Sequence, residues 1–143
     1  MKARVLIGLA AISLAVSVES GARAEDVVAV VSSKNSVTSL TTAQVADIFL
    51  GKSSRFPDGS QAMPIDQPED SPARDRFYAQ VTGKSAAQVK AYWSKIIFTG
   101  RGQPPVQASN GAEVKKMIAQ NPSAIGYIEP ALVDDSVRVV AVK

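Results

Sequence analysis

The chain has 143 residues, contains neither cysteine nor histidine, and carries a formal net charge of +3. These absences exclude disulfide bonds and nucleophilic triads with a histidine base, and they remove the commonest metal ligand. Most of the charge lies in the N-terminal segment, and no basic run interleaved with aromatic residues indicates nucleic-acid binding.

The first 24 residues have the pattern of a secretory signal peptide. Lys2 and Arg4 precede the apolar run Val5–Val18, and an A-x-A sequence ends at Ala24. The run is shorter than the roughly 20 residues of a membrane span, although a retained anchor remains the alternative. We therefore expect cleavage after Ala24 and one periplasmic domain, residues 25–143, which is too short for two domains.

The apolar, β-branched run Val27–Val31 predicts a buried strand. Ser32 and Ser33 follow it directly, and loops at the carboxyl ends of strands bind ligands in open α/β sheets. These two serines are secondary candidates for ligand contacts. A plain solvated loop is the equal alternative.

The segment Ser39–Lys52 predicts a helix with an apolar face. Thr41 and Gln44 have the spacing of a capping box, and Gly51 is placed to end the helix. A loop follows, and then Ala62–Ile65 predicts a second short strand.

The next helix begins at Ser71, a good N-cap residue, and Pro72 suits the first helical position. Unpaired backbone N–H groups and the positive end of the helix dipole make such a terminus a site for anions. The backbone N–H of Ala73 and the guanidinium of Arg74 are the further donors. The alternative is an ordinary capped helix whose positive end is neutralised by the preceding residues Glu69 and Asp70.

The same helix is expected to turn Phe77 and Val81 inward, to place Tyr78 at the margin, and to end at Gly83. A third helix follows, with a capping box from Ser85 and Gln88. Its apolar stripe predicts core packing rather than an aromatic ligand platform, and consists of Val89, Tyr92, Trp93, Ile96 and Ile97.

The composition of Thr99–Ser109 predicts a loop. Gly100 and Gly102 allow a close backbone approach to a ligand, and Arg101 offers a charged donor. Solvent exposure without a role is the alternative for Arg101.

Asn110, with Glu113, predicts the cap of a fourth helix and is another secondary ligand candidate. Strands are then expected at Ala124–Ile128 and Val137–Val142, the latter at a sheet edge because it carries Arg138. Strands alternating with four helices predict an α/β domain with a mostly parallel sheet.

Three of these segments resemble the periplasmic phosphate-binding proteins of ABC importers, and in particular their short, single-lobe relatives. The segments are Ser39–Lys52 (SLTTAQVADIFLGK), the run after Ser71, and Ala124–Tyr127 (AIGY). The resemblance spans about Val28 to Ile128. It implies a type II periplasmic-binding-protein fold, no enzymatic activity, no cofactor or metal, and a phosphate-like oxyanion held at helix N-termini.

In that family a Ser-Gly-Thr sequence at a helix start binds the anion. Ser71 matches the serine, and Arg74 matches the arginine that often follows. Pro72 and Ala73 stand in place of the glycine and threonine, so one N–H and one hydroxyl of the motif are missing.

The resemblance also implies a substrate-binding role beside an inner-membrane ABC permease, with a homodimer as one way to supply a second wall. A second hypothesis is a ligand-free interaction module of the same fold that binds a membrane sensor or transporter. An enzyme is the least expected class, because histidine and cysteine are absent.

Overall fold

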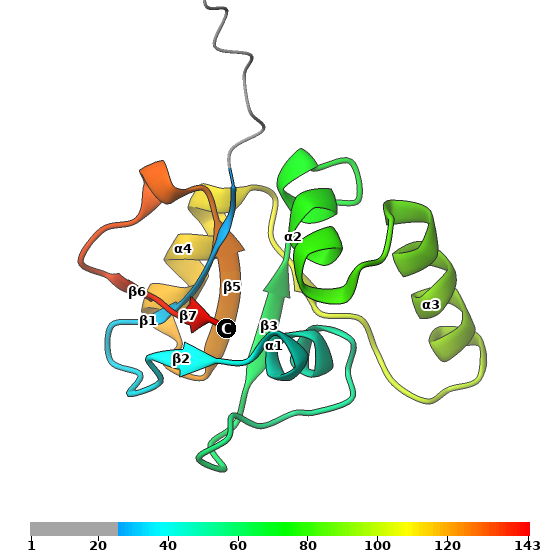
Figure 1. The fold of residues 1–143 in the computed structure, drawn as a ribbon, viewed down its shortest axis with the longest axis horizontal. Helices are drawn as coiled ribbons and strands as arrows, with labels where there is room; N and C mark the ends of the chain where they lie inside the picture. The colour runs from blue at the N-terminus through cyan, green and yellow to red at the C-terminus, as the bar shows by residue number, and fades with distance from the viewer. Residues whose placement is uncertain (1–25) are drawn as a thin grey trace, which may run out of the picture.

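The computed structural model describes residues 26–143. The predicted signal peptide, residues 1–24, lies outside them. A five-stranded sheet forms the centre, in the order β4-β3-β5-β1-β6 (Figure 1). Its strands, in that order, are Val106–Gln107, Met63–Asp66, Ala124–Ile128, Val28–Ser32 and Val137–Val139. A second, two-stranded sheet pairs β2 (Ser39–Leu40) with β7 (Ala141–Val142) in parallel.

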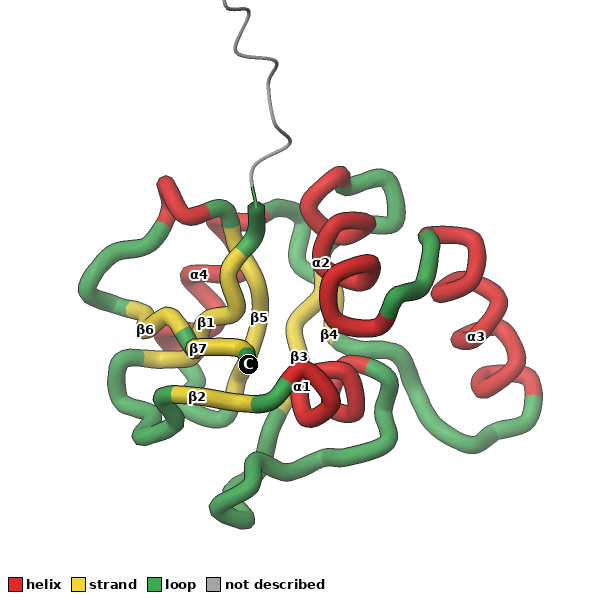
Figure 2. Tube along the Cα trace, viewed as in Figure 1, coloured by secondary structure: helices red, strands yellow, loops and turns green. Residues whose placement is uncertain are grey.

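Four α-helices form where the sequence predicts them, and a short 3-10 helix, Pro130–Leu132, follows β5. Helix α4 covers one face of the large sheet, while α1 and α2 cover the other (Figure 2). Helix α3 lies at the edge of the molecule, beyond α2 (Figure 1). The helices α1 to α4 are Thr42–Phe49, Pro72–Thr82, Ala86–Phe98 and Gly111–Gln120. Between residues 26 and 143, no helix is both long and apolar enough to cross a bilayer.

The large sheet is mostly parallel, as predicted. β3 pairs in parallel with β4 and β5, whereas β1 runs antiparallel to both of its neighbours, β5 and β6. β1 is therefore the one reversed strand of this sheet. The carboxyl ends of β3, β4 and β5 therefore share one end of the sheet, and the carboxyl end of β1 lies at the other.

Alternating side chains along β1 divide the core between the two faces of the sheet. Ala29 and Val31 belong to the cluster under α1 and α2, whereas Val30 belongs to the cluster under α4.

Helix α4 approaches the sheet closely at Gly126 of β5. A Cβ atom there would stand 2.6 Å from Cγ1 of Val114, which is closer than packed carbon atoms come. Glycine is therefore needed at this position.

The start and end of α1 confirm the predicted signals. Thr41 and Gln44 form the capping box, and Gly51 adopts a φ of 72° beyond the last turn. Ser39 and Leu40 precede the helix as a strand, because the C-terminal strand β7 pairs with them.

The predicted strand Val137–Val142 is two strands. The chain leaves the large sheet at Val140, whose N–H donates to the carbonyl of Ala29, and then continues as β7 beside β2. Its first part, β6, is an edge strand that carries Arg138, as expected. Residues 99–109 are not entirely a loop, because Val106 and Gln107 pair with β3.

Two burial predictions are wrong. Tyr78 is fully buried rather than marginal, because its hydroxyl has a buried partner in Asp66. Ile97 of the predicted α3 stripe is 55% exposed. Only Val89 and Trp93 of that stripe are buried, since α3 lies at the edge of the molecule and packs on the core along one side.

Candidate functional site

The start of α2 has the local structure that its sequence predicts. The Ser71 hydroxyl accepts a hydrogen bond from the backbone N–H of Arg74 at 3.4 Å, and Pro72 occupies the first helical position. The N–H of Asp75 donates to the Ser71 carbonyl at 3.2 Å. Within residues 26–143, the N–H of Ala73 makes no hydrogen bond, so it is an available donor at the positive end of the helix.

The two acidic residues before α2 do not cap this end. The carboxylate of Glu69 lies 3.9 Å from Nζ of Lys90 on α3, and both side chains are largely exposed. Asp70 is also exposed. Among the described residues, neither carboxylate accepts a hydrogen bond from the first turn of α2. The proposed neutralisation of the helix end by these acids is therefore not seen.

Arg74 is a buried cation with one ionic partner. The residue is only 6% exposed, and its Nε lies 3.4 Å from Oδ2 of Asp66 at the end of β3. Its guanidinium carbon lies 5.1 Å from the ring centre of Tyr78. Nε faces the Asp66 carboxylate without meeting hydrogen-bond geometry, and no described residue accepts a hydrogen bond from the two terminal nitrogens. These nitrogens are not fully buried, so they are free to donate to water or to a ligand.

The electrostatics of Arg74 follow from the same surroundings. Burial, the largest single influence, lowers the pKa of Arg74, but Asp66 together with Tyr78 and Tyr127 outweighs burial, so the pKa is raised above its usual value. Arg74 is therefore a cation at neutral pH.

Asp66 is the central acceptor of the site, and sequence analysis did not identify it. Its two carboxylate oxygens accept hydrogen bonds from the Tyr78 hydroxyl at 2.7 Å, the backbone N–H of Gln67 at 2.9 Å, and the Tyr127 hydroxyl. An acidic residue directly after a predicted strand was the available signal. Burial, and next the Asp66 charge, raise the pKa of both Tyr78 and Tyr127, so both phenols remain protonated donors.

Gln67 joins α2 to the sheet. Its side-chain amide donates to the carbonyl of Tyr127 at 2.9 Å and accepts from the Ser71 hydroxyl at 3.2 Å. Its own carbonyl accepts from the side chain of Gln107 on β4 at 3.3 Å. The Ser71 hydroxyl is thus already donating inside the protein. The carboxyl ends of β3, β4 and β5 hold the start of α2 in a fixed position.

The other predicted ligand residues lie apart from this cluster. Ser32 and Ser33 end the reversed strand β1 and lie at the opposite edge of the sheet. There, the Ser32 hydroxyl accepts from the N–H of Lys34 and the Ser33 carbonyl accepts from Arg138. Asn110 lies on the same edge as Ser71, but its side chain caps α4.

Loop residues Gly100, Arg101 and Gly102 lie at the end of α3. Arg101 is exposed, and within residues 26–143 its side chain makes no hydrogen bond or ion pair. Gly100 and Gly102 border a shallow surface hollow together with Ile97 and Pro104.

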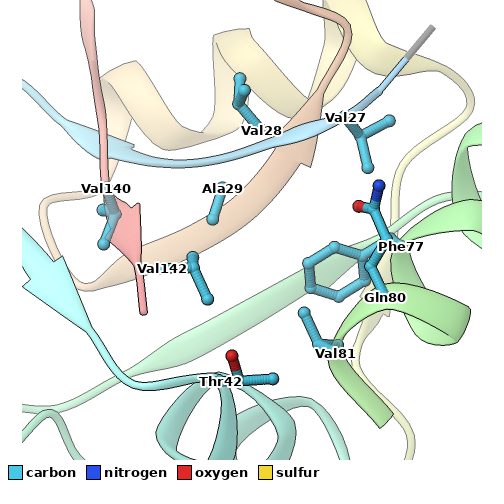
Figure 3. A pocket seen from close by; sticks show the side chains of 9 residues that line it. All are labelled: Val27, Val28, Ala29, Thr42, Phe77, Gln80, Val81, Val140 and Val142. Carbon is cyan, nitrogen blue, oxygen red and sulfur yellow. The ribbon is translucent and has the colours of Figure 1, made fainter. Parts of the chain in front are cut away.

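A separate hollow of about 320 Å³ lies between β1, β7 and the two helices α1 and α2 (Figure 3). Its walls are mostly valine, with Phe77 at one side and Thr42 and Gln80 as the polar contributors. No charged residue lines it, and it borders the second half of α2 rather than Ser71. It is therefore unsuited to an oxyanion. Nor does any part of the described chain gather a group of carboxylates that could hold a metal ion.

No family model matches the chain. Its structure is similar to a Clostridium perfringens protein, provisionally assigned as a phosphate ABC transporter substrate-binding protein and solved with bound phosphate. The identity is 24% and the TM-score 0.67, over 82% of this chain and 45% of that one. An ABC-type phosphate transport receptor from Vibrio cholerae matches at 19% identity and a TM-score of 0.66, over 82% and 46%. PstS from Borrelia burgdorferi matches at 14% and 0.61, over 83% and 47%.

The chain thus spans a little under half the length of these proteins. At such identities the likeness is one of fold. The described domain has the α/β fold of phosphate ABC transporter substrate-binding proteins, as the sequence motifs predict.

Proposed function

We propose that the protein is an exported, non-enzymatic solute-binding domain that holds phosphate or a similar small oxyanion at the start of α2. The main support is Arg74, a nearly buried cation whose terminal guanidinium nitrogens donate no hydrogen bond to any described residue. The available N–H of Ala73, one residue before it, is the second support. Ser71 belongs to the site through its contact with the N–H of Arg74.

The Asp66 cluster explains how an anion can bind beside a carboxylate. Each oxygen of Asp66 already accepts a hydrogen bond, from Tyr78 on one side and from Tyr127 and Gln67 on the other. These bonds disperse the Asp66 charge and hold Arg74 in place. The helix dipole then adds positive potential at the same end of α2.

The expected affinity is low. A charge-assisted hydrogen bond contributes roughly 1.5–3 kcal/mol, and a site on one wall leaves the anion partly in water. A dissociation constant of about 1 mM corresponds to only about 4 kcal/mol. We therefore expect millimolar binding by the domain alone. A second protein surface, from a homodimer or an ABC permease, would tighten it.

Export and a role in phosphate ABC transport complete the proposal. The structural neighbours carry phosphate transport or phosphate-binding names, and the N-terminal sequence has the signal-peptide pattern. Intact mass measurement of the protein recovered from the periplasm tests the export step. The expected chain begins at Glu25, and a chain that retains residues 1–24 would contradict cleavage.

Binding is tested by calorimetric titration with phosphate at constant ionic strength. Arg74→Gln is expected to weaken binding at least tenfold, because it removes the charge but keeps a polar side chain. Arg76→Gln is the matched control. It removes a cation from the same helix, where Arg76 pairs with exposed Asp26, and is expected to leave binding unchanged.

Circular dichroism establishes that each variant is folded. If Arg74→Gln fails to fold, Ala73→Pro provides the second test, because proline removes the Ala73 N–H yet suits the first turn of a helix. The proposed site is overturned if phosphate gives no binding heat with the wild-type protein. It is also overturned if Arg74→Gln and Ala73→Pro bind phosphate as tightly as the wild type.

A further inference from the structure

The end of α3 exposes two adjacent large apolar side chains. Phe98 is 91% exposed and Ile97 is 55% exposed. The helix closes immediately after them, with Gly100 at a φ of 67° and the N–H of Arg101 bonded to the carbonyl of Ile96. Both residues belong to the last turn of α3, a helix that lies at the edge of the molecule, away from the sheet (Figure 1). This last turn, with its two exposed apolar side chains, is called the tip below.

The same part of the chain is uniformly basic. Residues 77–112 contain Lys84, Lys90, Lys95 and Arg101 and no acidic residue, while the rest of the described chain has eleven acidic and nine basic residues. Lys95 and Arg101 flank the tip in sequence, and both are exposed. The exposed apolar pair is thus flanked by one exposed cation on each side in sequence.

We propose that this tip is a peripheral membrane contact for a bilayer rich in anionic phospholipid. Ile97 and Phe98 enter the boundary between headgroups and acyl chains, while Lys95 and Arg101 lie at the phosphate level. The two exposed cations beside the apolar pair, Lys95 and Arg101, give charge complementarity to such a surface. Two protruding side chains on one helix turn fit shallow insertion better than the broad buried core of a stable protein interface.

Co-sedimentation with phosphatidylcholine vesicles, with and without phosphatidylglycerol, tests this contact. The full 143-residue sequence is expressed, and the purified product is used without further truncation. We expect binding only to the vesicles with phosphatidylglycerol, and weaker binding as salt rises.

Paired substitutions separate the two contributions. Ile97→Ser with Phe98→Ser is expected to reduce partitioning at least tenfold. Lys95→Gln with Arg101→Gln is expected to reduce it about fivefold per charge and to flatten the salt dependence. Both pairs lie on exposed positions, so the fold is expected to persist, and circular dichroism checks this.

The matched control uses similar residues elsewhere on the surface. Val139 and Val142 are 42% and 38% exposed, and Lys34 and Lys116 are exposed cations outside the basic segment. Serine at the two valines and glutamine at the two lysines should leave vesicle binding unchanged. The proposal is overturned if the wild type ignores anionic vesicles or if the tip and control variants bind alike. It is also overturned if the protein binds only native membranes and protease treatment of those membranes abolishes binding, since the partner is then a protein.

Discussion

The starts of α2 and α4 lie at the same end of the sheet, yet the charged side chains around them differ. At α4, Glu113 accepts from the N–H and hydroxyl of Ser109, and an oxygen of Glu129 lies next to Gly111. At α2, Glu69 and Asp70 stay away from the helix end, the one acidic residue of the first turn, Asp75, is exposed, and the buried cation Arg74 lies beside it.

Under the proposed function, a helix N-terminus does not by itself make an anion site. Both termini have good capping residues, Ser71 and Asn110, and both carry the positive end of a helix dipole. Each helix has one carboxylate in its first turn, Glu113 in α4 and Asp75 in α2, and α4 has Glu129 beside its start as well. Only α2 also has a buried cation there, Arg74, whose partner Asp66 lies inside the core.

The largest expected effect comes from removing the buried partner of Arg74. Asp66→Ala leaves a buried cation without its carboxylate and two buried tyrosine hydroxyls without their acceptor. We expect a loss of about 3–5 kcal/mol in the free energy of unfolding, measured by urea denaturation. Asp26→Ala, which breaks the exposed pair with Arg76, should cost no more than about 1 kcal/mol. Equal losses would mean that the Asp66 cluster does not anchor α2.

The same cluster predicts instability in alkali. The pKa of Tyr78 and of Tyr127 is raised above the usual value of 10.0. A raised folded-state pKa gives stability that is complete below about pH 10 and is lost as pH rises beyond it. Urea denaturation across this range should show the loss, and Tyr78→Phe should reduce its slope. If Tyr78→Phe leaves this slope unchanged, Tyr78 does not contribute to the loss of stability in alkali.

A smaller effect is expected at the cap of α2. Ser71→Ala removes the cap and also the hydrogen bond to Gln67, so we expect a loss of about 2 kcal/mol. The control, Ser85→Ala at the exposed cap of α3, should cost about 1 kcal/mol. If thermal melts rank the two variants in the opposite order, Ser71 does not tie α2 to the sheet.

The smallest effect is expected at α4. Hydrogen bonds from Ser109 lower the pKa of Glu113 below its usual value of 4.5. The stability that this group contributes is therefore present above about pH 4.5 and is lost as pH falls below it. Glu113→Gln should slightly lower the melting temperature at neutral pH and weaken this acid dependence. If both proteins lose stability equally below this pH, the contact between Glu113 and Ser109 does not stabilise the start of α4.

Local signals in the sequence predicted the helices well. Thr41 with Gln44, Ser85 with Gln88, and Ser71 with Pro72 each specify a helix start through contacts within four residues, and all three occur as expected. Such contacts need no knowledge of the fold. The α/β class and the mostly parallel sheet followed from the alternation of these helices with apolar runs.

Long-range arrangements were not predictable in the same way. The reversal of β1, which moves Ser32 and Ser33 away from Ser71, depends on its pairing with β5 and β6, more than 90 residues later. The Asp66 cluster depends on Tyr127, 61 residues away. The burial of Tyr78 follows from that cluster, because a helical pattern alone cannot reveal an acceptor on a distant strand.

Gly126 sets the spacing between the central strand β5 and helix α4. Not even a methyl group fits between β5 and α4 at this point, because Val114 and Ile118 already touch the strand backbone. Moving α4 outward would open a gap in the apolar core between this helix and the sheet. A pocket engineered at the start of α4 must therefore be made by substituting the acidic residues there.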